Sequence, residues 1–295
     1  MSSSFHPRAA QSPPPKPGVP RGWLYFILVV ALLFVLMPFL FWQATWFGRP
    51  LTDAQMEKNL ADREHPRKAQ HALSQIADRI NSRDPSARAS ARRWYPQVVA
   101  LSTSHVDELR INAAWVMGQD NTAPEFHQAL VQLLSDPHPM VRRNAALSLV
   151  RFGDPSGRPV IVAMLEPYPV PAPQTGALSE RLKPGDVVNP GTLLGRIQNG
   201  REKIEIRSQA PGTIDRWLVK DGVPVSSGQP VVLLEPSPEM VWESLRALYL
   251  VGQPEDLPAI QRYIRGAPGM PERVRQQAEL TVKVIRGRGG PAPAM

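Results

Sequence analysis

Hydrophobic residues follow three different patterns along this chain. Residues 23–42 form an apolar run without a charged residue. Residues 52–165 place apolar side chains at helical spacing, a pattern that returns after residue 237, whereas residues 183–235 alternate short β-branched runs with Gly and Pro turns. Together these patterns predict an α+β protein of several domains, in which a small all-β segment interrupts a helical array.

The uncharged run predicts a single transmembrane helix within residues 22–46. Its twenty residues, 23–42, extend about 30 Å as a helix, which is the thickness of the hydrocarbon core of a bilayer. We expect neither a buried soluble helix nor a cleaved signal peptide, because the run is long and no small-residue cleavage site follows it. Aromatic residues flank the run as in a membrane-interface belt: Trp23, Tyr25, Trp42 and Trp46.

The positive charges around the run favour one orientation. Arg8, Lys16 and Arg21 precede the span, and only Arg49 and Lys58 follow it closely. The positive-inside rule then places the N-terminus in the cytoplasm and the remaining domains in the periplasm of a bacterial inner membrane.

Both ends of the chain have the composition of unstructured segments. Residues 1–21 are rich in Ser and Pro and lack an apolar period, and residues 287–295 are rich in Gly and Pro. We therefore expect disordered tails at 1–21 and 287–295.

Residues 166–236 predict a small β domain with internal symmetry. A Gly-x-x-Val-x-x-Gly unit at Gly185–Gly191 returns at Gly222–Gly228. Glycines at these positions close turns, and the valines between them are expected to point into a core. The duplication predicts two similar halves that pack against each other.

This segment resembles the biotinyl/lipoyl-like barrel-sandwich hybrid of carrier domains and of membrane-fusion adaptor proteins. Carriers present a lysine at a hairpin tip, and their spacing places it eleven residues before the Gly that begins the second half. Counting back from Gly212 reaches Arg201, whose guanidinium cannot form the amide that lipoate or biotin attachment requires. The resemblance therefore implies an unmodified domain. The alternative is a carrier protein with a lipoyl or biotinyl group on Lys203.

The helical regions contain a repeat. Val141-Arg-Arg-Asn-Ala-Ala-Leu-Ser-Leu149, followed by Gly153-Asp154, resembles the second helix of HEAT-type repeats, and a similar segment begins at Leu109, 32 positions before Val141. We expect a HEAT-like α-solenoid over residues 51–165, resumed at 237–286, with capping residues in Thr52-Asp53-Ala54-Gln55 at the start of its first helix. The arginines of the repeats are expected to form an exposed ridge of Arg110, Arg142 and Arg143.

No catalytic or metal-binding motif is recognisable. There is no phosphate-binding Gly-rich loop, nucleophile elbow or His-Glu-x-x-His, and a chain without cysteine has no disulfide or thiolate site. The net charge of +8 is spread as Arg along helices, without the aromatic-interleaved blocks of a nucleic-acid site. We expect no enzyme, no resident cofactor or metal, no nucleic-acid partner and no small-molecule substrate.

These features favour a single-pass, non-enzymatic scaffold or adaptor that binds subunits of a membrane protein complex in transport, respiration or photosynthesis. The expected contact residues are the arginine ridge and the hairpin tip, Asn199, Gly200, Arg201 and Lys203. A five-residue turn at 199–203 leaves no room for the long coiled coil of efflux adaptors, which argues against a tunnel-forming role. Some helical repeats belong to bilin lyases, but no residue set here supports that chemistry.

Overall fold

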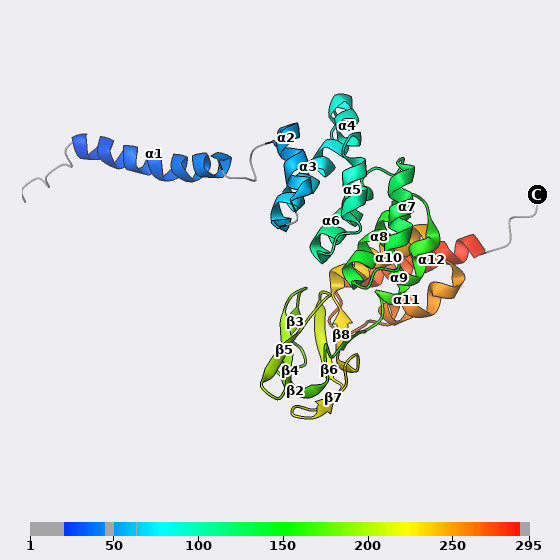
Figure 1. Cartoon of the computed structure of the whole chain (residues 1–295). Coiled ribbons are helices and arrows are strands. Elements are labelled where there is room, and N and C mark those ends of the chain that lie inside the picture. The colour runs from blue at the N-terminus through cyan, green and yellow to red at the C-terminus, as the bar shows by residue number, and fades with distance from the viewer. Residues whose placement is uncertain (1–20, 45–49, 63, 290–295) are drawn as a thin grey trace, which may run out of the picture. The chain divides into compact units, whose positions relative to one another are not determined.

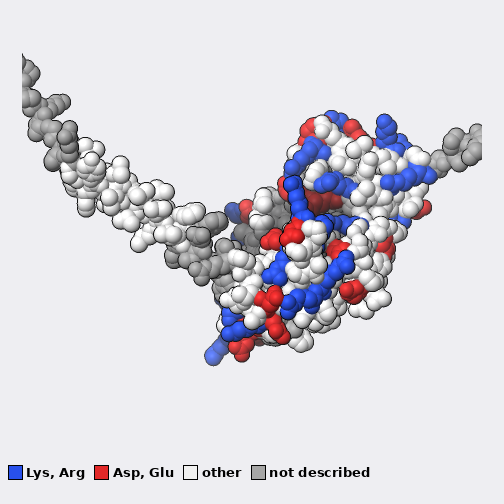
Figure 2. Space-filling view, turned by 90° about the horizontal axis from the view of Figure 1, so that it is seen from above, with Lys and Arg blue, Asp and Glu red and all other residues white. Residues whose placement is uncertain are grey.

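The computed structural model describes residues 21–44, 50–62 and 64–289, and its contacts divide the chain into two units, residues 1–51 and 52–295. The described part of the first unit contains α1 (Arg21–Ala44), drawn in blue in Figure 1. Its stretch Gly22–Leu40 has a mean hydropathy of 2.7 and is long enough to cross a membrane. Figure 2 shows this stretch without Lys, Arg, Asp or Glu. Such a helix near an N-terminus fits a membrane anchor or a signal sequence.

Several expectations for the ends fall outside the described residues. The expected tail at 1–20 and the last two positions of the expected membrane helix, 45 and 46, are among them. Helix α1 begins at Arg21, one residue earlier than expected.

The second unit begins with helices arranged in successive pairs. The second helix of each pair contacts the second helix of the next, so that α3 packs on α6 and α6 packs on α8. The first of them begins at the expected capping residues, where Thr52 and Gln55 form a capping box. The helices are α2 (Asp53–Ala61), α3 (Pro66–Ile80), α4 (Pro85–Arg92), α5 (Tyr95–Leu101), α6 (Asp107–Met117), α7 (Pro124–Leu133), α8 (Pro139–Arg151), the 3-10 turn η1 (Pro155–Gly157) and α9 (Arg158–Ala163).

Proline begins many of these helices. It lies in the first turn of α3, α4, α5, α7, α8 and α9, where its missing N–H has no helical partner to lose. The preceding side chains of Asp84 and His138 accept hydrogen bonds from the backbone N–H groups of Ser86 and Met140. Proline and, where present, the preceding cap thus define where these helices begin.

Small residues allow neighbouring helices to approach closely. The Ser148 hydroxyl of α8 donates to the Ala114 carbonyl of α6 over 2.8 Å. A Cβ added at Gly118 would lie 2.3 Å from the Ser148 Oγ, and one at Gly157 would lie 2.7 Å from the Ala146 Cα. The successive helices therefore touch through backbone and small side chains.

The β segment follows α9 and forms two four-stranded antiparallel sheets. One sheet has the strand order β1-β8-β6-β3 and the other β5-β4-β2-β7. Both contribute to one core, which contains Leu178, Ile197, Ile214 and Val232. The strands are β1 (Tyr168–Pro171), β2 (Gly176–Glu180), β3 (Val187–Val188), β4 (Leu193–Asn199), β5 (Glu202–Arg207), β6 (Gly212–Trp217), β7 (Pro224–Val225) and β8 (Pro230–Pro236).

The two sheets have equivalent strand orders. Replacing every strand by the one four places away converts one strand order into the other. Turn hydrogen bonds repeat in the same way: the Gly185 N–H donates to the Ile214 carbonyl, and the Gly222 N–H donates to the Leu178 carbonyl, each over 2.8 Å. Both glycines have positive φ. The two similar halves expected from the repeated unit are confirmed, with Val188 and Val225 buried.

The helical packing resumes after the β segment. Helix α10 (Pro238–Val251) contacts both α8 and α9, and it is followed by the 3-10 turn η2 (Pro254–Asp256), α11 (Leu257–Ile264) and α12 (Glu272–Gly289). Residues on both sides of the segment share one core, and the buried Tyr263 hydroxyl donates to the Leu165 carbonyl over 2.6 Å. Helix α12 continues to Gly289, so residues 287–289 are helical rather than part of a tail.

Candidate functional site

The tip of the β4–β5 hairpin is a two-residue turn. Asn199 pairs with Glu202, which leaves Gly200 and Arg201 as the loop. Gly200 has φ of 59°, and no described residue other than glycine has a positive φ. This combination is typical of a type II′ turn. The expectation of a five-residue turn is wrong, because the pairing of β4 with β5 continues up to Asn199 and Glu202 and leaves two residues between them.

Lys203 lies in strand β5 and not at the tip. It pairs with Gln198 and is exposed. Since side chains alternate along a strand, Ile204 and Ile206 face the core while Lys203 and Glu205 project from the opposite face. Arg201 therefore lies in the two-residue turn, and the amine of Lys203 emerges from the outer face of the sheet.

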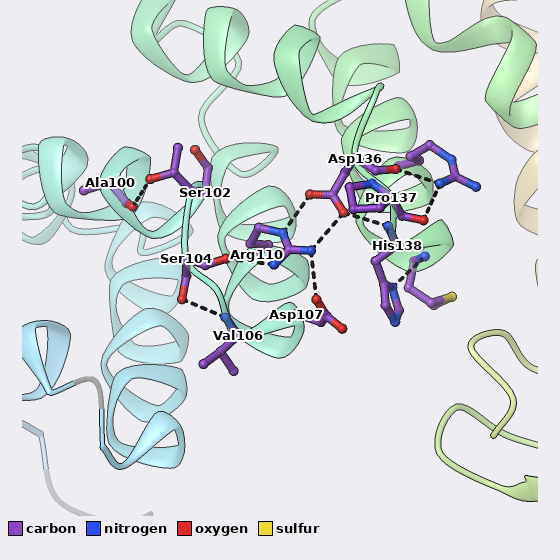
Figure 3. Close-up of polar contacts among 12 residues, drawn as sticks. Ala100, Ser102, Ser104, Val106, Asp107, Arg110, Asp136, Pro137 and His138 are labelled. Carbon is purple, nitrogen blue, oxygen red and sulfur yellow. Dashed lines mark hydrogen bonds and ion pairs between the residues drawn. The ribbon is translucent and has the colours of Figure 1, made fainter. Parts of the chain in front are cut away.

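Arg110 does not belong to an exposed ridge. Only 8% of the residue is exposed, and Figure 3 shows its guanidinium among Asp136, Asp107 and Ser104. It donates to both carboxylate oxygens of Asp136, at 2.7 and 3.1 Å, to Asp107 at 2.8 Å and to the Ser104 carbonyl at 2.7 Å. The expectation that this side chain extends into solvent is wrong. Its charge is used to join the loop before α6 to the loop before α8.

The carboxylate of Asp136 is stabilised by the same contacts. Burial alone would raise its pKa, but hydrogen bonds from Arg110 and from the His138 backbone N–H outweigh burial and lower the pKa below its usual value. Arg110 and Asp136 thus form a nearly buried ion pair, with 10% and 6% of their side chains exposed. Such a pair is costly to break, because one charge remains buried without its partner.

Arg142 and Arg143 are half-buried residues of α8 in different environments, so the expected exposed ridge is wrong for them too. Arg142 donates to the carbonyls of Asp136 and Pro137, at 2.6 and 2.8 Å. Arg143 forms an ion pair with Glu243 of α10 and donates to Asn144. The charge of Arg143 is therefore neutralised by Glu243, a residue that follows the β segment in sequence. The hydrogen bonds of Arg142 go to neutral carbonyls instead.

A cavity of about 270 Å³ lies where the helices meet the β segment, and we call it the junction cavity. Helices α8, α9 and α10 line one part of it, and strands β1 and β8 with the residues before β6 line the other. Its lining residues are Pro139, Met140, Arg142, Arg143, Pro159, Val160, Ala163, Met164, Glu166, Tyr168, Ala210, Pro211, Leu234, Glu235, Pro236 and Met240. Sequence reasoning missed this site, because these residues are far apart along the chain and share no motif.

Tyr168 is the aromatic residue of the junction cavity. Burial raises the pKa of its hydroxyl, and the positive charge of nearby Arg142 partly opposes that rise. The hydroxyl donates to the Gln209 side chain over 3.2 Å. Tyr168 thus remains a neutral hydrogen-bonding group near the cavity.

The described residues contain no group of three or more His, Cys, Asp or Glu side chains that could hold a metal ion. Several of the described histidines have structural contacts. His138 caps α8, and His127 lies 2.6 Å from a carboxylate oxygen of Asp154. Burial lowers the pKa of His71 below its usual value.

Comparison with known proteins identifies part of the helical region. A family profile of HEAT repeats matches residues 96–171. No curated protein matches the chain. Among solved structures, it is similar to an engineered protein at 16% identity, with 80% of each chain covered and a TM-score of 0.40. A single-chain, multi-domain long-chain acyl-CoA carboxylase aligns at 16% identity over 39% of this chain and 13% of that one, with a TM-score of 0.23. Both scores are low, so neither likeness supports an argument.

Replacing Arg110 tests the role of the buried pair. We expect Arg110→Lys to lower the free energy of unfolding by about 2 kcal/mol, because an ammonium group cannot make the forked contact with Asp136. The change is measured by urea denaturation followed by circular dichroism. Arg151→Lys, at an exposed position of α8, is the control and should change stability by less than about 0.5 kcal/mol. Equal effects in the two variants would contradict the assignment.

The lowered pKa of Asp136 predicts a pH dependence. A carboxyl with a depressed folded-state pKa stabilises the fold above its unfolded pKa of about 4, and this stability is lost as pH falls through the folded value. The free energy of unfolding should therefore fall less steeply below pH 4 in Asp136→Asn than in the wild-type protein. Identical slopes in acid denaturation would exclude this contribution.

Proposed function

We propose that this protein is a membrane-anchored, non-enzymatic scaffold or adaptor of a bacterial envelope complex. The observation that carries the proposal is the HEAT-repeat match at residues 96–171, whose helices share contacts and a core with those after the β segment. HEAT repeats commonly mediate protein–protein contacts, and stacked repeats provide extended binding surfaces. The partners would be subunits of a transport, respiratory or photosynthetic complex.

The β segment is proposed to be an unmodified biotinyl/lipoyl-like barrel-sandwich hybrid inserted into a HEAT-like solenoid. Two observations support this reading: the equivalent strand orders of the two sheets and the position of Arg201 in the turn of the β4–β5 hairpin. The two-residue turn also replaces the long coiled coil of efflux adaptors. In this role the segment is a rigid docking module, with Asn199, Gly200, Arg201 and Lys203 at its contact end.

The alternative, a carrier with lipoate or biotin on Lys203, is distinguished by mass. Lys203 is exposed, but it lies in a paired strand two residues from the turn, on the outer face of the sheet. A ligase that recognises a hairpin-tip lysine should not modify it. We expect the protein from its native membrane to have the unmodified mass, in the intact chain and in the Lys203 peptide. A mass increase of one lipoyl or biotinyl group on that peptide would contradict the scaffold proposal and support the carrier alternative.

Anchoring is proposed through α1, with the N-terminus in the cytoplasm and residues 52–295 in the periplasm. The apolar stretch Gly22–Leu40 and the excess of positive charge before it support this orientation. Because the chain lacks cysteine, single-cysteine labelling is unambiguous. In intact spheroplasts, a membrane-impermeant maleimide should label Lys220→Cys and leave Ser3→Cys unlabelled until the membrane is lysed. The reverse pattern would invert the orientation, and loss of both variants from the membrane fraction would exclude anchoring.

The proposed contact end is tested by charge reversal. We expect Arg201→Glu combined with Lys203→Glu to reduce recovery of the co-purifying complex from native membranes about tenfold. The reason is that two positive charges proposed to face the partner become negative charges that repel it. Lys220→Glu, an exposed position of the same segment outside the hairpin, serves as the control. Equal recovery of the complex with all variants would exclude the hairpin tip as the contact. Isolation of the wild-type chain without any partner would contradict the scaffold proposal itself.

A further inference from the structure

The junction cavity combines an apolar lining with a small number of charges. Three methionines line it from different elements: Met140 of α8, Met164 after α9, and Met240 of α10. Methionine side chains are flexible and polarisable, so they adapt to apolar groups of different shape. Small residues at Ala163 and Ala210 leave the space between them open. The lining therefore suits an alkyl chain or a single ring better than a polar ligand.

The charges that line the cavity leave one cation without an acidic partner. Glu235 and Glu166 both lie near Arg262, at 2.5 and 3.9 Å, and Arg143 is paired with Glu243. Arg142 forms no ion pair with any described residue, and one of its terminal nitrogens donates to the carbonyls of Asp136 and Pro137. The charges of the four ionised lining residues, Arg142, Arg143, Glu166 and Glu235, sum to zero, but Arg142 presents a guanidinium without an acidic partner beside apolar walls.

The size of the cavity limits its ligand. Its volume of about 270 Å³ exceeds the ~150 Å³ that encloses a benzene ring and lies just below the ~300 Å³ at which sites for drug-sized molecules begin. A short alkyl chain fits this space, whereas a full phospholipid or a folded peptide does not. An anionic head would complete the match by pairing with the guanidinium of Arg142.

We propose that the junction cavity binds a small amphiphilic anion, a short-chain alkyl carboxylate, with its tail among the three methionines and its carboxylate on Arg142. The binding site is independent of the scaffold role, since it rests on the cavity and not on any protein partner. Because the lining comes from both the helices and the β segment, an occupied cavity holds these two parts together.

The experiment uses the full chain in phosphatidylcholine nanodiscs with methionine labelled by ¹³C at the ε-methyl group. Sodium octanoate is the probe, and empty nanodiscs correct for partition into lipid. We expect saturable shifts for Met140, Met164 and Met240, assigned by Met→Leu variants. Met56 and Met117 are fully buried, do not line the cavity and should not shift.

Variants separate the charge from the cavity. Arg142→Gln should weaken octanoate binding about tenfold and leave 1-octanol binding unchanged, because only the anion uses the guanidinium. Arg151→Gln on the same helix is the matched control and should not change the affinity for octanoate. Ala163 is an exposed residue of the lining. Ala163→Trp places a large ring in the opening of the cavity and should abolish binding of both octanoate and 1-octanol.

Three outcomes would overturn the proposal. The first is the absence of a saturable shift at all three methionines with octanoate. The second is octyltrimethylammonium binding as tightly as octanoate, since a cation would then be accepted beside Arg142. The third is shifts of equal size at Met56 or Met117, which would indicate a general effect on the fold. None of these results depends on recovery of a protein partner, so failure here and failure of the scaffold proposal are distinguishable.

Discussion

The pairing of β1 with β8 is the contact on which the second unit depends. Tyr168 lies opposite Leu234, so the first and last strands of the β segment are neighbours, and the chain leaves and re-enters the helices at one place. Helices α9 and α10 can therefore contact each other and share one core, although 75 positions of sequence separate the end of α9 from the start of α10. A segment whose ends lay far apart would prevent these two helices from packing together.

The same geometry explains the junction cavity. The helices and the β segment each bury their own core, and few buried residues connect them: Met164, Ala210 and Met240. A row of helices and a twisted sheet present surfaces of different shape, so their contact is filled incompletely unless large side chains occupy the gap. Ala163 and Ala210 are small, and the gap remains open. The cavity is thus a consequence of inserting one compact element into another.

Arginine has several distinct roles in this protein, and the position of each residue decides which one applies. Arg110 is buried and joins two loops through Asp136, Asp107 and Ser104. Arg142 and Arg143 lie one residue apart on α8, yet one contacts neutral carbonyls and the other an acid from α10. Arg201 is exposed at a turn. The spread of Lys and Arg over the face seen in Figure 2 therefore does not by itself define a binding surface.

The sequence by itself determined the apolar span, the region of HEAT repeats and the duplicated halves of the β segment. These features rest on local periodicity and on glycine turns, which residues near one another in the chain specify. Only the tertiary structure decided that Arg110 is buried, that Arg143 pairs with Glu243 and that a cavity forms at the junction. Those outcomes depend on groups 26 to 100 positions apart, and the spacing of residues along a helix does not encode which distant acid or carbonyl will meet them.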